Sequence, residues 1–230
     1  NSEASISGMG KAVSVLNVLS AAAERLNDAS DFKTYGVSNS QKDAFSVTTT
    51  SNARTGSNSI TVSQIAQEQR SVSSEFASTS ASLNGGAAIT LSMVIGSSST
   101  STTNIVVNEP TLQSTVAAIN NANLGVTAEI VDTGGNGNNY RIQLIGETGA
   151  EKAFSLTSSE SSLTFSSVQT ATDANISLNG IDFTRATNVI DDVLTGVTLT
   201  LNGPTTGAAS LAINQDNSEA RANIVDFVAI

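Results

Sequence analysis

The chain has 230 residues and contains neither cysteine nor histidine. Without cysteine it forms no disulfide and offers no thiolate for catalysis or for a zinc site. Without histidine it lacks the base of a Ser-His-Asp triad and the imidazole that often binds metal ions. These two absences exclude the commonest catalytic and metal centres. We therefore expect a protein that is not an enzyme and that holds no cofactor and no metal.

Aromatic and charged residues are also scarce. Tryptophan is absent, aromatic residues make up 4% of the chain, and charged residues make up 13%. A core must then be built from Val, Ile, Leu and Ala, while the Ser, Thr, Asn and Gly that remain favour strands and turns over a helical bundle. No apolar run reaches 18 residues, so the sequence predicts no membrane insertion.

The charge is strongly one-sided, with a formal net charge of −10. An acidic chain repels phosphate backbones and the headgroups of anionic lipids. We therefore expect no nucleic-acid partner.

One long helix is predicted over residues 9–31. Its apolar side chains recur at alternating spacings of four and three, at Ala12, Leu16, Leu19, Ala23 and Leu26. This heptad spacing places one apolar stripe along the helix. An isolated helix of this length is marginal in water, and each buried leucine contributes about 1.5–3 kcal/mol only against a partner. The candidate helix-contact residues are Leu16, Leu19 and Leu26; the alternative is an ordinary amphipathic helix on a globular core.

After this helix the period of the sequence changes to two, which is typical of strands. Strands are predicted around residues 45–49, 60–62, 89–95, 105–107, 126–130, 140–144, 154–156, 176–178, 181–183, 197–201 and 211–213. The first two of these are expected to form a hairpin around Gly56. Asn179 and Gly180 form the preferred two-residue hairpin turn, because both accept a positive φ.

Three further helices are predicted. The first begins at Asn108 as its N-cap and ends over residues 121–125, where Gly125 supplies a left-handed position. The second covers residues 187–194. The last begins at a capping-box-like pair, Asp216 and Glu219.

The order of elements predicts which parts close on each other. The two terminal helices are expected to pair, the first strands to close with the last ones, and the middle to form an inserted domain. Such closure is tolerated because loop entropy grows slowly with length. The helical pattern still runs at residues 224–230, and we interpret the sequence as an excised fragment.

Several short motifs, in the right order, resemble the flagellar hook-associated protein 2 family of filament cap proteins. The N-terminal ones are Leu26-Asn27-Asp28-Ala29-Ser30-Asp31-Phe32 and Val62-Ser63-Gln64-Ile65-Ala66-Gln67. The central ones are Ala118-Ile119-Asn120-Asn121-Ala122, which is similar to an Ile-Asn motif, Gly125-Val126-Thr127-Ala128 and Tyr140-Arg141-Ile142-Gln143-Leu144. The last ones are Val193-Leu194-Thr195-Gly196-Val197-Thr198-Leu199 and Ile213-Asn214-Gln215-Asp216.

The resemblance implies a fold class of α+β, mainly β, with two β-rich head domains, one inserted in the other, on a leg of N- and C-terminal helices. The expected domains are the leg at 1–40 and 216–230, the inner head at 41–70 and 172–215, and the outer head at 71–171. The resemblance also implies an extracellular structural protein at the flagellum tip, where a ring-shaped homo-oligomer guides flagellin and so serves motility.

Two other functions are weighed. A secreted adhesin or carbohydrate-binding β-domain, serving cell adhesion, predicts aromatic platforms, and aromatic residues are scarce. A hook–filament junction protein is the third hypothesis.

Two acidic segments are weighed as sites. The oxygen-rich loop Asp132–Asn139 lacks the bidentate Glu that closes a calcium loop, so we predict a flexible hairpin loop. The pair Asp191-Asp192 is interpreted as a solvated face.

Overall fold

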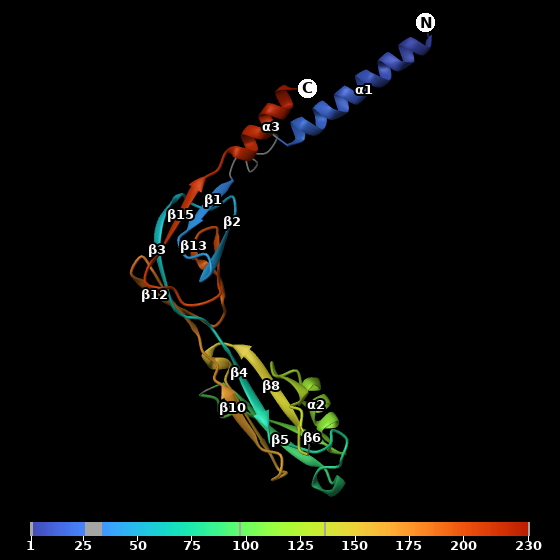
Figure 1. Cartoon of the computed structure of the whole chain (residues 1–230), viewed down its shortest axis with the longest axis vertical. Coiled ribbons are helices and arrows are strands. Elements are labelled where there is room, and N and C mark those ends of the chain that lie inside the picture. The colour runs from blue at the N-terminus through green and yellow to red at the C-terminus, as the bar shows by residue number, and fades with distance from the viewer. Residues whose placement is uncertain (1, 26–33, 97, 136, 230) are drawn as a thin grey trace. The chain divides into compact units, whose positions relative to one another are not determined.

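The computed structural model describes residues 2–25, 34–96, 98–135 and 137–229, together with the side chains of these residues except 2–8 and 219. Helices α1 (Ser2–Glu24) and α3 (Ser218–Val228) lie at the two ends of the chain, and strands make up most of what lies between them (Figure 1). This confirms the predicted fold class of α+β, mainly β. No helix among the described residues is long and apolar enough to cross a membrane.

The chain divides into two compact units. The first comprises residues Asn1–Ile60, Val189–Thr200 and Thr205–Ile230, and the second comprises Thr61–Asn188 and Leu201–Pro204. The second unit is therefore longer than the outer head predicted over 71–171, and its first boundary falls inside a strand.

Two sheets are built from the flanking parts of the sequence. The five-stranded sheet has the order β1 (Tyr35–Asn39), β15 (Ala209–Gln215), β3 (Gly56–Gln64), β11 (Ala174–Leu178), β12 (Ile181–Arg185). The three-stranded sheet has the order β13 (Val189–Leu194), β14 (Val197–Leu201), β2 (Phe45–Thr49). Alternate residues of these strands are buried, including Phe45, Leu199 and Leu211. This is the period-two pattern that the sequence predicts.

Two further sheets are built from the middle of the sequence. One has the order β10 (Phe165–Gln169), β4 (Glu68–Ser73), β8 (Tyr140–Thr148), β7 (Thr127–Asp132), and the other has the order β6 (Thr102–Val107), β5 (Ile89–Ile95), β9 (Phe154–Ser158). Helix α2 (Leu112–Asn121) contacts β6, β7 and β8. Strands of both sheets and α2 contribute to one apolar core, in which Leu91, Leu112 and Leu144 are fully buried.

The Asn179-Gly180 hairpin is confirmed. The two residues have φ angles of 53° and 82°, and Leu178 lies opposite Ile181 across the turn. The predicted strands at 89–95 and 105–107 pair with each other as β5 and β6, and those at 126–130 and 140–144 pair as β7 and β8, both in antiparallel register.

The predicted hairpin around Gly56 is wrong, because β2 and β3 belong to different sheets. The turn after β2 is held by the turn that joins β13 and β14: the backbone N–H of Thr50 donates to the carbonyl of Gly196 at 2.8 Å. The chain then crosses to the other sheet, where β3 pairs with β15. A long-range contact thus overrides a local pattern.

The helix predicted over residues 187–194 is also wrong, because this segment forms β13. Leu194 lies opposite Val197, so Thr195 and Gly196 form a two-residue loop, with Gly196 at φ +70°. The register shifts between Ile190 and Leu194, which interrupts the strict alternation of a strand. This irregularity explains why the apolar spacing resembled that of a helix.

The helix ends differ from their predictions. The N-cap of α2 is Thr111, not Asn108: the Thr111 hydroxyl accepts from the N–H of Ser114 at 3.1 Å, and the Ser114 hydroxyl accepts from the N–H of Thr111 at 2.8 Å. The N-cap of α3 is Asn217, whose side chain makes no capping bond, whereas Asp216 accepts from the N–H of Ser218.

Two differences concern the N-terminal region. Helix α1 already begins at Ser2, before the predicted start at residue 9, and residues 26–31 lie outside the described residues. No strand is predicted from the sequence before residue 45, but Tyr35–Asn39 form strand β1, which pairs with β15.

Candidate functional site

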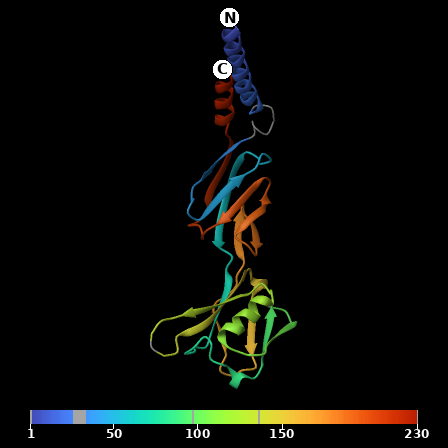
Figure 2. The same ribbon diagram turned by 90° about the vertical axis from the view of Figure 1, so that its right-hand side faces the viewer.

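The two terminal helices lie side by side within the first unit (Figures 1 and 2). A groove of about 450 Å³ runs between them, lined by Val18, Ala21 and Ala22 of α1 with the adjoining Arg25, and by Asp226 of α3 with the adjoining Ala229. The alanines leave room for the helices to approach, and Ala22 is buried there. Arg25 and Asp226 contribute opposite charges to the same groove, which favours this pairing.

The predicted leucine stripe does not form this groove. Because a helix turns about 100° per residue, Leu16 lies roughly opposite Val18 and Arg25 on the helix circumference. Leu16 is 62% exposed, and Leu19 is half-buried. Leu26 lies outside the described residues. The contact with α3 therefore uses one side of α1 and leaves the side that carries Leu16 uncovered.

Both terminal helices carry exposed apolar side chains. On α1, Met9, Val13 and Leu16 follow one another at spacings of four and three, and more than half of each is exposed. On α3, Ile224 and Val228 are also exposed, at 45% and 78%. No contact residue on α3 was predicted from the sequence, although the apolar pairs Ile224-Val225 and Phe227-Val228 indicate one. Exposed large apolar side chains are typical of sites of protein–protein contact, and we define these five side chains as the leg surface.

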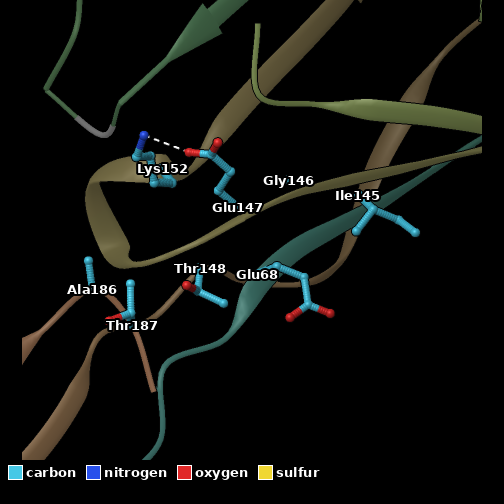
Figure 3. Close-up of a pocket in the computed structure, with 8 residues that line it drawn as sticks. All are labelled: Glu68, Ile145, Gly146, Glu147, Thr148, Lys152, Ala186 and Thr187. Atoms are coloured by element: carbon cyan, nitrogen blue, oxygen red, sulfur yellow. Dashed lines mark ion pairs between the residues drawn. The ribbon is translucent and has the colours of Figure 1, made fainter. Parts of the chain in front are cut away.

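A second hollow lies in the second unit, with a volume of about 600 Å³ (Figure 3). Its lining residues are Glu68, Ile145, Gly146, Glu147, Thr148, Lys152, Ala186 and Thr187. The ammonium of Lys152 pairs with the carboxylate of Glu147 at 2.6 Å, and both side chains are half exposed. Glu68 is paired with Arg70 at 2.7 Å. The charged groups of this hollow are thus already paired within the chain.

The loop weighed as a calcium site is stabilised by its own hydrogen bonds. The carboxylate of Asp132 accepts from the N–H of Gly134 at 2.9 Å and from the side-chain amide of Asn139 at 2.6 Å. Among the described residues, no group of three or more His, Cys, Asp or Glu side chains is placed to hold a metal ion. Asp191 and Asp192 lie on β13, and both side chains are exposed.

Comparison with known proteins agrees with this arrangement of helices around a β-rich middle. Residues 1–69 match the family model described as flagellar hook-associated protein 2 N-terminus, and residues 171–230 match the one described as flagellar hook-associated protein 2 C-terminus. The chain belongs to the flagellar hook-associated protein 2 family. A flagellar hook-associated protein 2 from Treponema maltophilum is 40% identical over 60 residues, which cover 26% of this chain and 9% of that protein.

Solved structures of the family share the fold. The D1-D2-D3 domains of the flagellar cap protein FliD from Escherichia coli align with a TM-score of 0.78 and 29% identity, over 97% of this chain and 66% of that one. The D2-D3 domains of the Serratia marcescens protein align with a TM-score of 0.63 and 25% identity, over 74% of this chain and 100% of that one. This chain therefore spans about two thirds of the Escherichia coli D1-D2-D3 chain and 9% of the Treponema maltophilum protein.

Proposed function

We propose that this chain is part of a cap at the distal tip of the bacterial flagellar filament, outside the cell, where it guides flagellin assembly as an oligomeric scaffold. One observation carries the proposal: the two ends of the chain match the two family models and meet each other as α1 and α3. The similar protein from Escherichia coli is a flagellar cap protein, which supports the same role for this chain.

The proposed mechanism is mechanical and not catalytic. The leg surface binds copies of the chain, with Leu16, Leu19 and Leu26 as helix-contact residues, while the β-rich heads form a ring-shaped homo-oligomer that holds flagellin at the tip. The heads correspond to residues 41–70 with 172–215 and to residues 71–171. The exposed apolar side chains of α1 and α3 support this role, because their burial stabilises an assembly by about 1.5–3 kcal/mol per large side chain.

The substitution Leu16→Asp tests the assembly role in the whole protein to which this chain belongs. It places a charge in the middle of the leg surface, and we expect the oligomer to dissociate, cells to lose motility and flagellin to escape as monomers into the medium. Light scattering measures the assembly, a swimming assay measures motility, and an immunoblot of the medium measures the escaped flagellin. Asn17→Asp is the matched control, since it adds the same charge one residue away on another side of α1.

Assembly and motility that survive Leu16→Asp would contradict the role of the leg surface. A protein that stays monomeric without any substitution and binds glycans would instead support the adhesin hypothesis.

A further inference from the structure

Two segments of the chain cross from the five-stranded sheet to the sheet that contains β4 and β10. They are residues 65–67, between β3 and β4, and residues 170–173, between β10 and β11. At their centre Gln67 and Thr172 form an antiparallel bridge: the N–H of Gln67 donates to the carbonyl of Thr172 at 2.9 Å, and the reverse bond measures 3.0 Å. The two crossings are therefore bonded to each other.

Next to this bridge, the side chain of Asn188 pairs with the backbone of Ala66, the residue that precedes Gln67. The amide of Asn188 accepts from the N–H of Ala66 at 2.7 Å and donates to the carbonyl of Ala66 at 2.9 Å. Both backbone groups of Ala66, which is 3% exposed, are thus satisfied by one neutral amide that takes the place of a strand. The chain that leaves β12 is thereby tied to the first crossing.

A fourth segment is held at the same place. The carboxylate of Asp173 accepts from the N–H of Ala150 at 2.7 Å, and the carbonyl of Gln67 accepts from the N–H of Gly149 at 3.3 Å. Gly149 has a φ of +107°, and a Cβ atom there would lie 2.7 Å from the Cβ of Ala186. The turn after β8 thus packs directly on the segment that precedes Asn188, as the ribbon beside Ala186 and Thr148 in Figure 3 shows.

We infer that these six residues, Ala66, Gln67, Gly149, Thr172, Asp173 and Asn188, form a crossing latch that makes the passage between the sheets a rigid joint and not a hinge. All six belong to the second compact unit, whose boundaries fall inside β3 and after Asn188 and not at the crossing. The latch ties together four chain segments, so that bending there requires several hydrogen bonds to break at once. This inference goes beyond the proposed function and does not depend on it.

Amide hydrogen exchange on the intact chain tests the latch. The N–H groups of Ala66, Gln67 and Thr172 should exchange far more slowly than that of an exposed loop residue such as Gly207. In Asn188→Ala the N–H of Ala66 should exchange about tenfold faster or more, because its acceptor is lost. The N–H groups of Gln67 and Thr172 should follow because the joint opens more often, while the N–H of Leu144 in β8 stays unchanged. Asn202→Ala removes an exposed amide from a loop and serves as the control.

Fast exchange at Ala66 and Thr172 in the unsubstituted chain would overturn the inference. An equal rise at Leu144 in Asn188→Ala would also overturn it, because Asn188 would then support global stability only.

A distance measurement tests rigidity first in a chain whose latch is intact and then after one latch residue is substituted. Since the chain has no cysteine, Asp182→Cys in β12 and Glu129→Cys in β7 introduce the only two labelling sites. Both side chains are exposed, and both lie in the second unit. Pulsed electron–electron double resonance between spin labels at these two positions should give one narrow distance distribution. Adding Asn188→Ala should broaden it. A broad distribution before that addition would show a hinge and refute the latch.

Discussion

At the scale of single residues, neutral side-chain amides bond the backbone N–H and C=O groups of one residue, as a neighbouring strand would. Asn120 accepts from the N–H of Ala128 at 2.7 Å and donates to the carbonyl of Ala128 at 2.9 Å. Gln69 makes the same pair of bonds to Phe154, and Gln41 makes it to Thr206. A chain without disulfides thus ties distant segments together through side chains whose charge does not depend on pH.

This pairing gives the Ile-Asn motif a physical role. Ile119 is 1% exposed in the core of the second unit, while Asn120 covers the open edge of β7 at Ala128. A covered edge no longer offers free N–H and C=O groups to another strand. The Ile-Asn motif was recognised only by its resemblance to the family, and the structure shows what its two side chains do.

We expect Asn120→Ala to lower the free energy of unfolding by about 2 kcal/mol, because it leaves both backbone groups of Ala128 without their partner. Urea unfolding followed by circular dichroism measures the change. Asn121→Ala is the matched control, since it alters the neighbouring, exposed asparagine of the same helix and should leave stability nearly unchanged. Equal effects of the two variants would show that Asn120 contributes only through helix propensity.

At one buried hydroxyl, a substitution is expected to raise the free energy of unfolding. The Thr115 side chain on α2 is fully buried, and its hydroxyl has no hydrogen-bond partner within the described structure. Thr115→Val keeps the shape and removes the polar group, so we expect the free energy of unfolding to rise by about 1 kcal/mol. Thermal or urea unfolding tests this. Thr127→Val, whose exposed hydroxyl donates to the carbonyl of Ile145 at 3.3 Å, should bring no such gain.

At the scale of elements, the β13–β14 hairpin decides how the flanking sheets connect. Gly196 has a φ of +70°, and a Cβ atom there would lie 2.4 Å from the backbone nitrogen of Ala53. The loop of this hairpin therefore packs directly on the turn that follows β2. Only a glycine satisfies both the backbone conformation and the close approach.

Gly196→Ala should lower the free energy of unfolding by about 3 kcal/mol, because it combines a strained positive φ with a backbone clash. Gly203→Ala is the control: a Cβ atom at Gly203 meets nothing within 4 Å, and its effect should lie within about 0.5 kcal/mol of zero. Chemical unfolding of both variants measures the difference. A loss of less than about 1 kcal/mol in Gly196→Ala would mean that the turn shifts freely.

At the scale of the whole molecule, the absence of histidine shapes the response to pH. The pKa of Glu68 lies below its ordinary value of 4.5, because backbone and Arg70 hydrogen bonds favour its ionised form. Hydrogen bonds from Ser162 and Ser218 lower the pKa values of Glu160 and Asp216 in the same way. A lowered pKa in the folded state contributes stability that is present above the ordinary carboxyl pKa and is lost as pH falls through the folded value.

We therefore expect the urea midpoint to stay flat from about pH 8 to pH 6, since no side chain of ordinary pKa titrates there, and to fall once the pH drops below about 4.5. Urea titrations at each pH provide the measurement. A clear change of stability between pH 8 and pH 6 would contradict this, because it would require a group whose pKa is shifted by folding within or into that range.

What could be predicted from the sequence was whatever depends on neighbours along the chain. The Asn179-Gly180 turn, the alternating strands of the middle and the long N-terminal helix each follow from local backbone preference and from the spacing of apolar residues. The leucine stripe was visible for the same reason. Its partner was not visible, because spacing shows that a face is apolar and does not show what covers it.

Tertiary structure alone decided three other features: the strand at 189–194, the separation of β2 from β3, and the side of α1 that meets α3. Each depends on contacts between residues far apart in sequence, such as Thr50 with Gly196, or Val18 with Asp226 across one groove. Local preferences in these segments differ by only about 1 kcal/mol per residue, so burial and backbone pairing with distant segments determine the outcome.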